Sequence, residues 1–287
     1  FNSRGLLRFW KRRWFRTLPN YYLVLLVNII FVKWHMVEGD LHHFNWKYFF
    51  FMHNFSSAMP GFFFESWSLS IEEWFYLFTP LLLFGFLKLF PLKKALLITI
   101  LLLIVVPVLS RYLKCDPGNM QWYWTDEEIR KVVIMRLDAI GYGLLAAWLA
   151  FYYAGFWKKC RFWFLGLGLA LHFIMDQYNT VTNALYLQFF YFSLSSFAAM
   201  LYLPFAHSIG SVKGRLAKAV TYISKISYSM YLVNLGIVAS IMRLHFPVKD
   251  TGDGIIKYVI YWFAVITLSG IIYRFFEKPM MNLRDKL

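Results

Sequence analysis

Long apolar segments recur along the whole chain, separated by charged or turn-rich breaks. Each is close to the length of about 20 residues that an α-helix needs to cross the hydrocarbon core of a bilayer. The pattern predicts an all-α, polytopic membrane helix bundle, because a helix satisfies its backbone hydrogen bonds internally. We expect about eight spans, near residues 20–38, 69–89, 95–113, 134–153, 161–176, 183–206, 226–245 and 255–275.

Residues 44–64 are rich in aromatic side chains but do not read as a span, because His53, Asn54 and Pro60 interrupt them. Irregular backbone at membrane depth must pack against protein. We therefore expect a loop or re-entrant element that is covered by protein rather than by lipid. No segment has the composition of a linker, so residues 1–287 are expected to form a single domain.

The charged residues predict the orientation of the chain. When the breaks are assigned to alternate faces of the membrane, most lysines and arginines fall on one face and most acids on the other. Cytoplasmic loops carry an excess of Lys and Arg. We therefore place both termini in the cytoplasm, together with the basic segments 4–16, 88–94, 158–161, 213–225 and 274–286.

Composition agrees with a membrane environment. The 287 residues are 60% hydrophobic and 16% charged, whereas a soluble domain has about 25% charged residues. Topology and anionic lipid headgroups explain the net charge of +15, since the basic residues lie between apolar runs. We expect the lipid bilayer, and not nucleic acid, to be the partner of this charge.

Cysteines and histidines give no metal site in this sequence. Cys115 and Cys160 have no metal-ligand spacing, and the predicted topology separates them, so we expect no disulfide between them. The histidines form no H-E-x-x-H pattern. Either His35 or His53, near the outer face, could act as a base, but we expect both to be solvated or interfacial.

Two adjacent carboxylates enter the second predicted span, in the segment WSLSIEEWFY. Polar groups at membrane depth are costly, so each is a functional candidate. On a helix, Ser68, Glu72 and Tyr76 share one face, and Glu73 points about 100° away from Glu72. Glu72 could act as a general base or hold a substrate hydroxyl. It could equally pair with an arginine to fix helix packing, and the residues alone leave both interpretations open.

A basic stripe precedes the first predicted span. Arg8, Arg12 and Arg16 recur every four residues before Pro19, and Arg13 adds a flank. Guanidinium groups bind phosphate through paired hydrogen bonds, which suits the phosphates of a nucleotide-bearing cofactor at the cytoplasmic surface. The same residues could serve only for topology and headgroup anchoring.

Arg136 and Asp138 lie at the outer end of the fourth predicted span. Successive residues of a helix point to different faces, so we expect these two to meet partners on other helices. Arg136 could neutralise Glu72 or Glu73, which would be a structural role, a catalytic role or both.

Two polar segments occur toward the end of the chain. Tyr231 and Asn234 could line a polar path in the seventh span or simply bond neighbouring helices. Glu277, which Lys278 and Pro279 follow, is expected to terminate the last span, because proline disrupts a helix.

Four segments resemble the acyltransferase 3 family of membrane O-acyltransferases. The most specific is WSLSIEEWFYLFTP, which is similar to the family signature W-S-L-x-x-E-x-x-F-Y. The basic segment RFWKRRWFRTLPNYY resembles a stretch that ends in R-x-x-P-x-Y. The segments RLDAIGYG and ISYSMYLVN, the latter followed by FEKP, complete the series in order.

The resemblance implies an enzyme that moves an acyl group, commonly acetyl from acetyl-CoA, to sugar hydroxyls outside the cytoplasmic (inner) membrane of bacteria. Acyl-CoA would be a co-substrate, no tightly bound cofactor is implied, and the acceptor would be a polysaccharide or glycolipid. We also expect residues 44–64 to shape the acceptor site. On this basis we assign catalysis to Glu72 and Glu73, donor binding to Arg8, Arg12, Arg13 and Arg16, and substrate binding to Trp67, Ser68, Tyr76, Arg136 and Asp138.

The chain departs from the family pattern in two respects. Members of the family usually have about ten spans, of which two precede the basic stretch and carry a histidine that is regarded as central to catalysis. That histidine matches no residue here, so we expect this chain by itself to be inactive. Histidine also often stands where this sequence has Asn234.

Two functions from other classes use the same residues. A transporter or flippase for a glycolipid or acyl group would place buried carboxylates along a substrate pathway. A catalytically silent membrane protein would keep the helices without the reaction.

Overall fold

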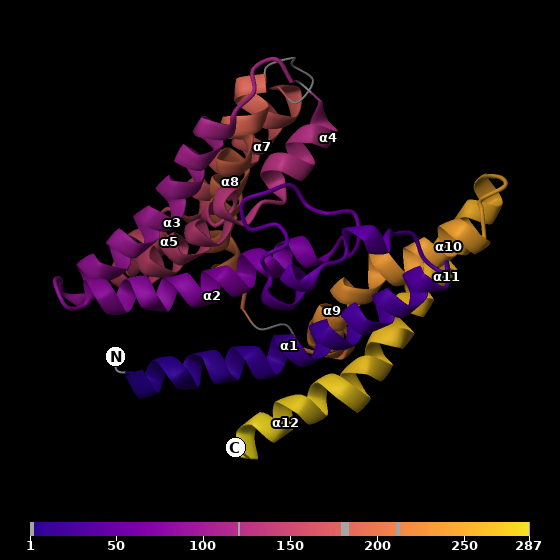
Figure 1. Cartoon of the computed structure of the whole chain (residues 1–287). Coiled ribbons are helices and arrows are strands. Elements are labelled where there is room, and N and C mark those ends of the chain that lie inside the picture. The colour runs from indigo at the N-terminus through magenta and orange to yellow at the C-terminus, as the bar shows by residue number, and fades with distance from the viewer. Residues whose placement is uncertain (1–2, 120, 179–183, 211–212, 287) are drawn as a thin grey trace. The chain divides into compact units, whose positions relative to one another are not determined.

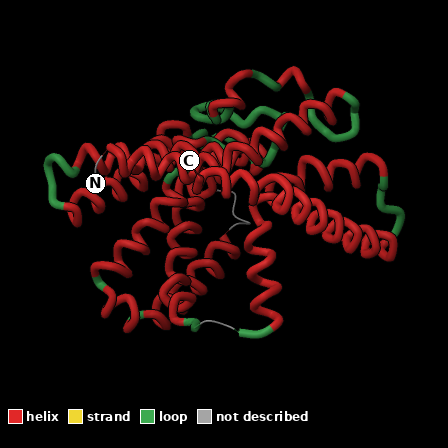
Figure 2. The backbone as a smooth tube through the Cα atoms, turned by 90° about the horizontal axis from the view of Figure 1, so that it is seen from below, coloured by secondary structure: helices red, strands yellow, loops and turns green. Residues whose placement is uncertain are grey.

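The computed structural model describes residues 3–119, 121–178, 184–210 and 213–286. In these ranges every regular element is a helix, as Figure 2 shows, which confirms the all-α class. The chain divides into two compact units. Unit 1 consists of Phe1–His53, Pro60–Ser66 and Val212–Leu287, and unit 2 consists of Asn54–Met59 and Trp67–Ser211.

Unit 1 is built around a first helix and the C-terminal helices. Helix α1 packs against α9, η7 and α12, and α9 packs against α11 (Figure 1). The elements are α1 (Ser3–Lys33), η1 (Leu41–His43), η2 (Trp46–Phe50), α9 (Arg215–Val233), η6 (Asn234–Ala239), α10 (Ser240–His245), α11 (Thr251–Ile272), η7 (Tyr273–Glu277) and α12 (Lys278–Lys286).

Helix α1 is longer than the span predicted for this region. It continues through Pro19 and includes the whole basic stripe, and it ends at Lys33 instead of residue 38. After it the backbone turns at His35, which has a positive φ of 57°. The 31 residues of α1 extend about 46 Å at 1.5 Å per residue. This exceeds the hydrocarbon thickness of about 30 Å, so a straight crossing leaves part of α1 outside the hydrocarbon.

The expectation that Glu277 terminates the last span is wrong. The helix continues from α11 through the π-helical turn η7 into α12, and Pro279 lies inside it. A π turn bonds residue i to i+5 and is wider than a regular α turn. Because Pro279 follows this widened turn directly, its ring meets a loosened part of the helix, which explains why the chain does not stop there.

Unit 2 is a bundle in which α3 packs against α5, α5 against α8, and α7 along α8 (Figure 1). Short helical turns connect the longer helices. The elements are α2 (Ser66–Phe86), α3 (Leu92–Lys114), α4 (Trp122–Thr125), η3 (Asp126–Arg130), η4 (Val133–Met135), α5 (Asp138–Tyr152), α6 (Ala154–Lys159), α7 (Arg161–Tyr178), η5 (Tyr186–Phe190) and α8 (Tyr191–Ser208).

Six helices within the described residues are long and apolar enough to cross a membrane, so the predicted number of eight is not confirmed. The two remaining predictions correspond to α5 and α7. Helix α5 has 15 residues, which span about 22 Å, and α7 carries Arg161, His172 and Asp176 in its 18 residues. The predicted start of one span at residue 183 lies outside the described residues.

The aromatic segment 44–64 forms loops and short turns, as predicted, but it is only partly covered by protein, because Trp46, Phe49 and Phe50 are exposed. Tyr48, Phe62 and Phe63 are buried, and the hydroxyl of Tyr21 in α1 donates a hydrogen bond to the Tyr48 carbonyl (2.8 Å). Irregular backbone here is stabilised by such contacts. Its central part, Asn54–Met59, belongs to unit 2.

A buried ion pair joins three helices of unit 2. Arg111 of α3 and Asp138 of α5 have fully buried side chains, and Arg111 Nη2 lies 2.9 Å from Asp138 Oδ2. The hydroxyl of Ser193 in α8 donates to the same oxygen (2.8 Å), and Arg111 Nη1 donates to the Met135 carbonyl. Each charge is therefore held by several partners, which a buried ion needs.

Replacing Arg111 with leucine should destabilise the protein strongly. The variant leaves Asp138 buried without its counter-ion, which costs about 3–5 kcal/mol. The thermal unfolding midpoint of the detergent-solubilised protein should fall accordingly. The double variant Arg111→Leu with Asp138→Leu should recover only part of the loss, because it removes the buried ion pair but leaves Arg136 without its nearest carboxylate.

The exposed pair of Arg243 and Glu38 provides the control, since its side chains are 57% and 39% exposed. Arg243→Leu should cost only about 0–1 kcal/mol. Equal losses for Arg111→Leu and Arg243→Leu would show that the buried pair does not hold the bundle together.

Candidate functional site

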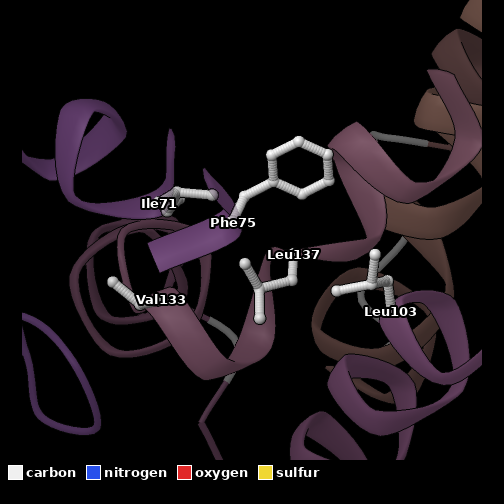
Figure 3. Packing of buried hydrophobic residues seen from close by; sticks show 5 residues of the cluster. All are labelled: Ile71, Phe75, Leu103, Val133 and Leu137. Carbon is white, nitrogen blue, oxygen red and sulfur yellow. The ribbon is translucent and has the colours of Figure 1, made fainter. Parts of the chain in front are cut away.

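The two carboxylates of α2 lie beside a buried contact between α2 and the segment that leads into α5. Ile71 and Phe75 of α2 pack with Val133, Leu137 and Leu103, as Figure 3 shows. Glu73 is buried and Glu72 is half-buried. The structure thus brings the WSLSIEE segment and the RLDAIGYG segment together in unit 2.

The other assigned residues of α2 are also half-buried. Helix α2 includes Ser68, Glu72 and Tyr76, so their spacing of four residues places them on one face, as predicted. Trp67 is fixed from two sides. The guanidinium of Arg130 lies over its ring at 4.7 Å from the centroid, and its carbonyl accepts a hydrogen bond from Asn54 Nδ2 (3.2 Å).

Arg136 and Asp138 lie on either side of Leu137, directly before α5 and at its first residue. Asp138 meets partners on other helices, as expected, namely Arg111 and Ser193. The idea that Arg136 neutralises Glu72 or Glu73 is wrong. The carboxylate beside Arg136 is Asp138, at 3.7 Å, because both side chains come from the same short segment.

The basic stripe lies on the first half of α1. Arg8, Arg12 and Arg16 are exposed, and their four-residue spacing on a continuous helix puts them on one face. Arg13 is half-buried, and its guanidinium lies over the Phe9 ring at 5.8 Å. The three exposed guanidinium groups are available to a phosphate-bearing ligand, whereas Arg13 is partly engaged in packing.

The basic segment and the ISYSMYLVN segment meet in unit 1 through a buried polar network. Asn20 Nδ2 donates to Ser229 Oγ (2.9 Å) and to Glu277 Oε2 (3.1 Å). Ser229 Oγ donates to the same carboxylate oxygen (2.6 Å). The network joins α1, α9 and η7, so Glu277 is a helix-packing residue in the middle of a helix rather than its terminator.

A carboxylate that the sequence pattern did not single out lies in unit 1. Glu65 directly precedes α2 and is 1% exposed. Its Oε1 accepts hydrogen bonds from the backbone N–H groups of Leu235 (3.0 Å) and Gly236 in η6. Tyr231 of α9 donates to the Glu65 carbonyl (2.9 Å). The sequence gives one sign that Glu65 is buried, namely its position within the aromatic run FFFES. Its location between two predicted spans instead suggested a solvated loop.

The π turn η6 explains why backbone N–H groups are available there. Its wider hydrogen-bond pattern interrupts the regular ladder, and such turns are frequent at functional sites. Residue 236 must be small, because a Cβ on Gly236 would lie 2.9 Å from Glu65 Oε2 and 3.3 Å from Asn28 Oδ1. The carboxyl group of Glu65 and the amide of Asn28 in α1 therefore converge on one glycine.

Burial raises the pKa of Glu65 to about 7, although the N–H groups of Gly236 and Leu235 and the charge of Arg243 oppose the shift. A carboxyl group with such a pKa can take up or release a proton near neutral pH. A surface cavity of about 270 Å³ adjoins this region and is lined by Glu38, Phe64, Leu235, Gly236, Ser240 and Arg243. Unit 1 thus offers a proton-accepting group behind the wall of a small, mostly apolar surface cavity.

His53 is buried, so the expectation that it is solvated or interfacial is wrong. It is 2% exposed, and its ring stacks on Tyr48 with centroids 4.1 Å apart. Burial lowers the pKa of His53 to about 3, so the ring is neutral. Ser66 Oγ lies 2.9 Å from His53 Nε2 but donates its hydrogen to the Phe63 carbonyl (2.6 Å). This serine is therefore not activated by the histidine, and the pair has a packing role.

No cluster of three or more His, Cys, Asp or Glu side chains in the described part of the chain could hold a metal ion. Cys115 and Cys160 are free thiols.

Glu65→Gln should alter the pH dependence of stability. In the unfolded chain the carboxyl titrates near 4.5, and in the folded protein near 7. The stabilisation from the bound proton is therefore complete below about pH 4.5 and is lost as the pH rises through about 7. The difference between the thermal unfolding midpoints of the wild type and Glu65→Gln should become smaller as the pH is raised from 5 to 8.

Asp250→Asn is the matched control, because Asp250 caps α11 in the same unit and asparagine caps a helix equally well. It should retain the wild-type pH profile. His53 contributes the opposite slope to every variant, so it cancels in the comparison. A pH-independent difference between wild type and Glu65→Gln would show that Glu65 does not titrate in this range.

Comparison with known proteins agrees with the arrangement of these segments. A family model of the acyltransferase 3 type, described as an acyltransferase domain, matches residues 1–274. No curated protein and no solved structure matches the chain. The matched range includes RFWKRRWFRTLPNYY, WSLSIEEWFYLFTP, RLDAIGYG and ISYSMYLVN, whereas FEKP at residues 276–279 lies beyond it. The chain therefore belongs to the acyltransferase 3 family of membrane acyltransferases.

Proposed function

We propose that the protein transfers an acyl group, in the first instance acetyl, from cytosolic acyl-CoA to a hydroxyl of an extracytoplasmic polysaccharide or glycolipid. The hydroxyl oxygen forms a bond to the thioester carbonyl carbon, the carbon–sulfur bond breaks, and the hydroxyl proton ends on the sulfur of free CoA. The reaction needs a group that accepts this proton and a site that holds the donor. Family membership supports acyl transfer, and the donor, acceptor and direction are our proposal.

The exposed stripe of Arg8, Arg12 and Arg16 supports the choice of donor. CoA carries phosphates at its nucleotide end, and guanidinium groups on one helix face can bind them by paired hydrogen bonds. The stripe lies on the predicted cytoplasmic side, where acyl-CoA is found. Arg13 would contribute charge from the flank.

The carboxylates of α2 support the acceptor end of the reaction. We assign Glu72 as the group that accepts the proton of the attacking hydroxyl. Glu73 would help to hold Glu72 and the hydroxyl in place. Trp67, Ser68 and Tyr76 would line the acceptor site, because they lie on the first turns of the same helix. Sugar hydroxyls are commonly held by aromatic faces and by hydroxyl or carboxylate partners.

The observation that carries the proposal is the course of α1 within unit 1. Its first half presents Arg12 to solvent, and 16 residues later Asn28 converges with Glu65 on Gly236. At 1.5 Å per residue this separation is about 24 Å. One helix therefore joins a cationic surface to a buried carboxylate across most of a bilayer thickness, which suits a donor and an acceptor on opposite sides.

The distribution of charge supports the orientation in a bacterial cytoplasmic membrane. An even number of spans, such as the six candidates among the described residues, would bring the N-terminal stripe and the C-terminal basic residues to the same side. The excess of Lys and Arg on this side favours a cytoplasmic location for both termini.

Glu72→Gln should abolish acyl transfer by the full-length protein. Removing a group that accepts the hydroxyl proton lowers the rate by about 10²–10⁴-fold. Membrane vesicles that contain the protein are supplied with radiolabelled acetyl-CoA, and alkali-labile label is measured on the glycan and glycolipid fractions. Insertion into the membrane should be unchanged, as judged from the amount of folded protein.

Glu128→Gln is the matched control, because Glu128 belongs to the same unit and pairs with Lys114 at the surface. It should keep most of the activity. Equal activity of Glu72→Gln and the wild type would remove Glu72 from the reaction. Movement of a glycolipid across the membrane without ester formation would instead identify a transporter.

The triple variant Arg8→Gln, Arg12→Gln, Arg16→Gln should bind acyl-CoA more weakly. A hydrogen bond to a charged group contributes about 1.5–3 kcal/mol, so the KM for acetyl-CoA should rise at least about tenfold. Acetyl-pantetheine lacks the nucleotide phosphates, and its use should be affected little. Lys158→Gln with Lys159→Gln keeps the stripe and should leave the KM unchanged. A triple variant that impairs both donors equally would contradict phosphate recognition.

A further inference from the structure

The buried charges at the start of α5 do not balance. Asp138 Oδ2 accepts hydrogen bonds from Arg111 Nη2 (2.9 Å) and Ser193 Oγ (2.8 Å). Asp138 Oδ1 lies 3.7 Å from Arg136 Nη1, which is too long for a hydrogen bond. The carboxylate of Asp138 therefore lies beside two guanidinium groups, but of these only that of Arg111 donates a hydrogen bond to it.

The guanidinium of Arg136 has hydrogen-bond donors that nothing in the described residues fills. Its Nε and Nη1 are buried and have no hydrogen-bond partner there, and its side chain is only 14% exposed. One face of the group lies over the Phe192 ring, 4.9 Å from the centroid. A buried donor without an acceptor is costly, so the group is placed to receive an acceptor from outside.

Neighbouring acids do not compensate Arg136. The three acids of η3 instead form ion pairs with Lys114, Arg130 and Lys131. Arg130 itself covers the ring of Trp67. Arg136 thus stands out from the other cations of this region, each of which has a close carboxylate partner.

We propose that Arg136 binds an oxyanion, a carboxylate or a phosphate group, on the acceptor. The planar fork of an arginine is suited to such groups, and the Phe192 ring beneath it fixes the plane. The part of this inference that concerns the acceptor rests on the proposed function. The acceptor would then be an acidic glycan or a phosphate-bearing glycolipid.

The position of Arg136 relates this anion site to the carboxylates of α2. Val133 and Leu137, which flank it in sequence, pack against Ile71 and Phe75 (Figure 3). The backbone of the segment that carries Arg136 therefore lies against the part of α2 that carries Glu72 and Glu73, while the guanidinium itself lies over Phe192 of α8. The anchor orients the acceptor, and a hydroxyl of the same molecule is presented to α2.

A titration with small anions tests the site without any need for activity. The full chain is purified in neutral detergent, and sodium phosphate or sodium glucuronate replaces sodium chloride at constant ionic strength. The background is the triple variant Arg8→Gln, Arg12→Gln, Arg16→Gln, which removes the stripe on α1. The anions should raise the thermal midpoint of this background, and adding Arg136→Gln should abolish the rise.

Two further variants make the result specific. Arg136→Lys keeps the charge but loses the fork, so its half-saturating anion concentration should be at least about tenfold higher. It also carries the test if Arg136→Gln does not fold. Lys114→Gln removes a paired cation of the same unit and should leave the anion effect intact. A stronger effect of glucuronate would identify the acceptor group that binds Arg136 as a carboxylate, and a stronger effect of phosphate would identify it as a phosphate.

The inference is overturned if the anions do not stabilise the background, or if Arg136→Gln or Arg136→Lys keeps the full effect. In the acyl-transfer assay, Arg136→Gln should raise the KM for the acceptor and leave the KM for acetyl-CoA unchanged. Absence of transfer in the wild type would contradict the proposed function alone, because the titration would still decide the anion site.

Discussion

A charged or polar group that is buried in a membrane protein has to find its partners inside the protein, and this constraint organises both units. In unit 2, Arg111 and Asp138 satisfy it together and fix three helices against each other. In unit 1, Glu277 accepts hydrogen bonds from two other helices. Lipid-facing residues can be replaced by other apolar residues. The buried polar contacts cannot be replaced in this way, because removing one partner leaves the other polar group in apolar surroundings without a hydrogen bond.

The same constraint explains the surroundings of Glu65. A carboxylate in this position needs donors, and the π turn η6 supplies two backbone N–H groups that a regular helix would use internally. Gly236 allows the close approach. A departure from helical regularity in one element thus compensates a buried charge that comes from another. Arg136 is the opposite case in unit 2, because its donors are buried and its nearest acceptor, Asp138 Oδ1, lies 3.7 Å away, beyond hydrogen-bond distance.

The sequence was sufficient for the features that depend on averages over many residues. Apolar length predicted the all-α class, and four-residue spacing placed Arg8, Arg12 and Arg16 on one face of α1. It failed where a single residue decides. Arg111 lies within the apolar run of α3, so the average hydropathy conceals it, and Glu65 and His53 lie in a loop that looks solvent-accessible by position. Pro279 does not end the helix, because a π turn precedes it. This turn is defined by backbone hydrogen bonds, which residue types do not predict.

The uninterrupted course of α1 through Pro19 has a mechanical consequence. A helix of this length behaves as a stiff rod, since its turns are joined by hydrogen bonds except where Pro19 has no N–H to donate. When a ligand pulls on the guanidinium groups at one end, the tilt that results displaces Asn28 at the other end as well. Under the proposed donor binding, a tilt of α1 at the stripe would reach the surroundings of Glu65 through the helix itself, because Asn28 belongs to the same helix.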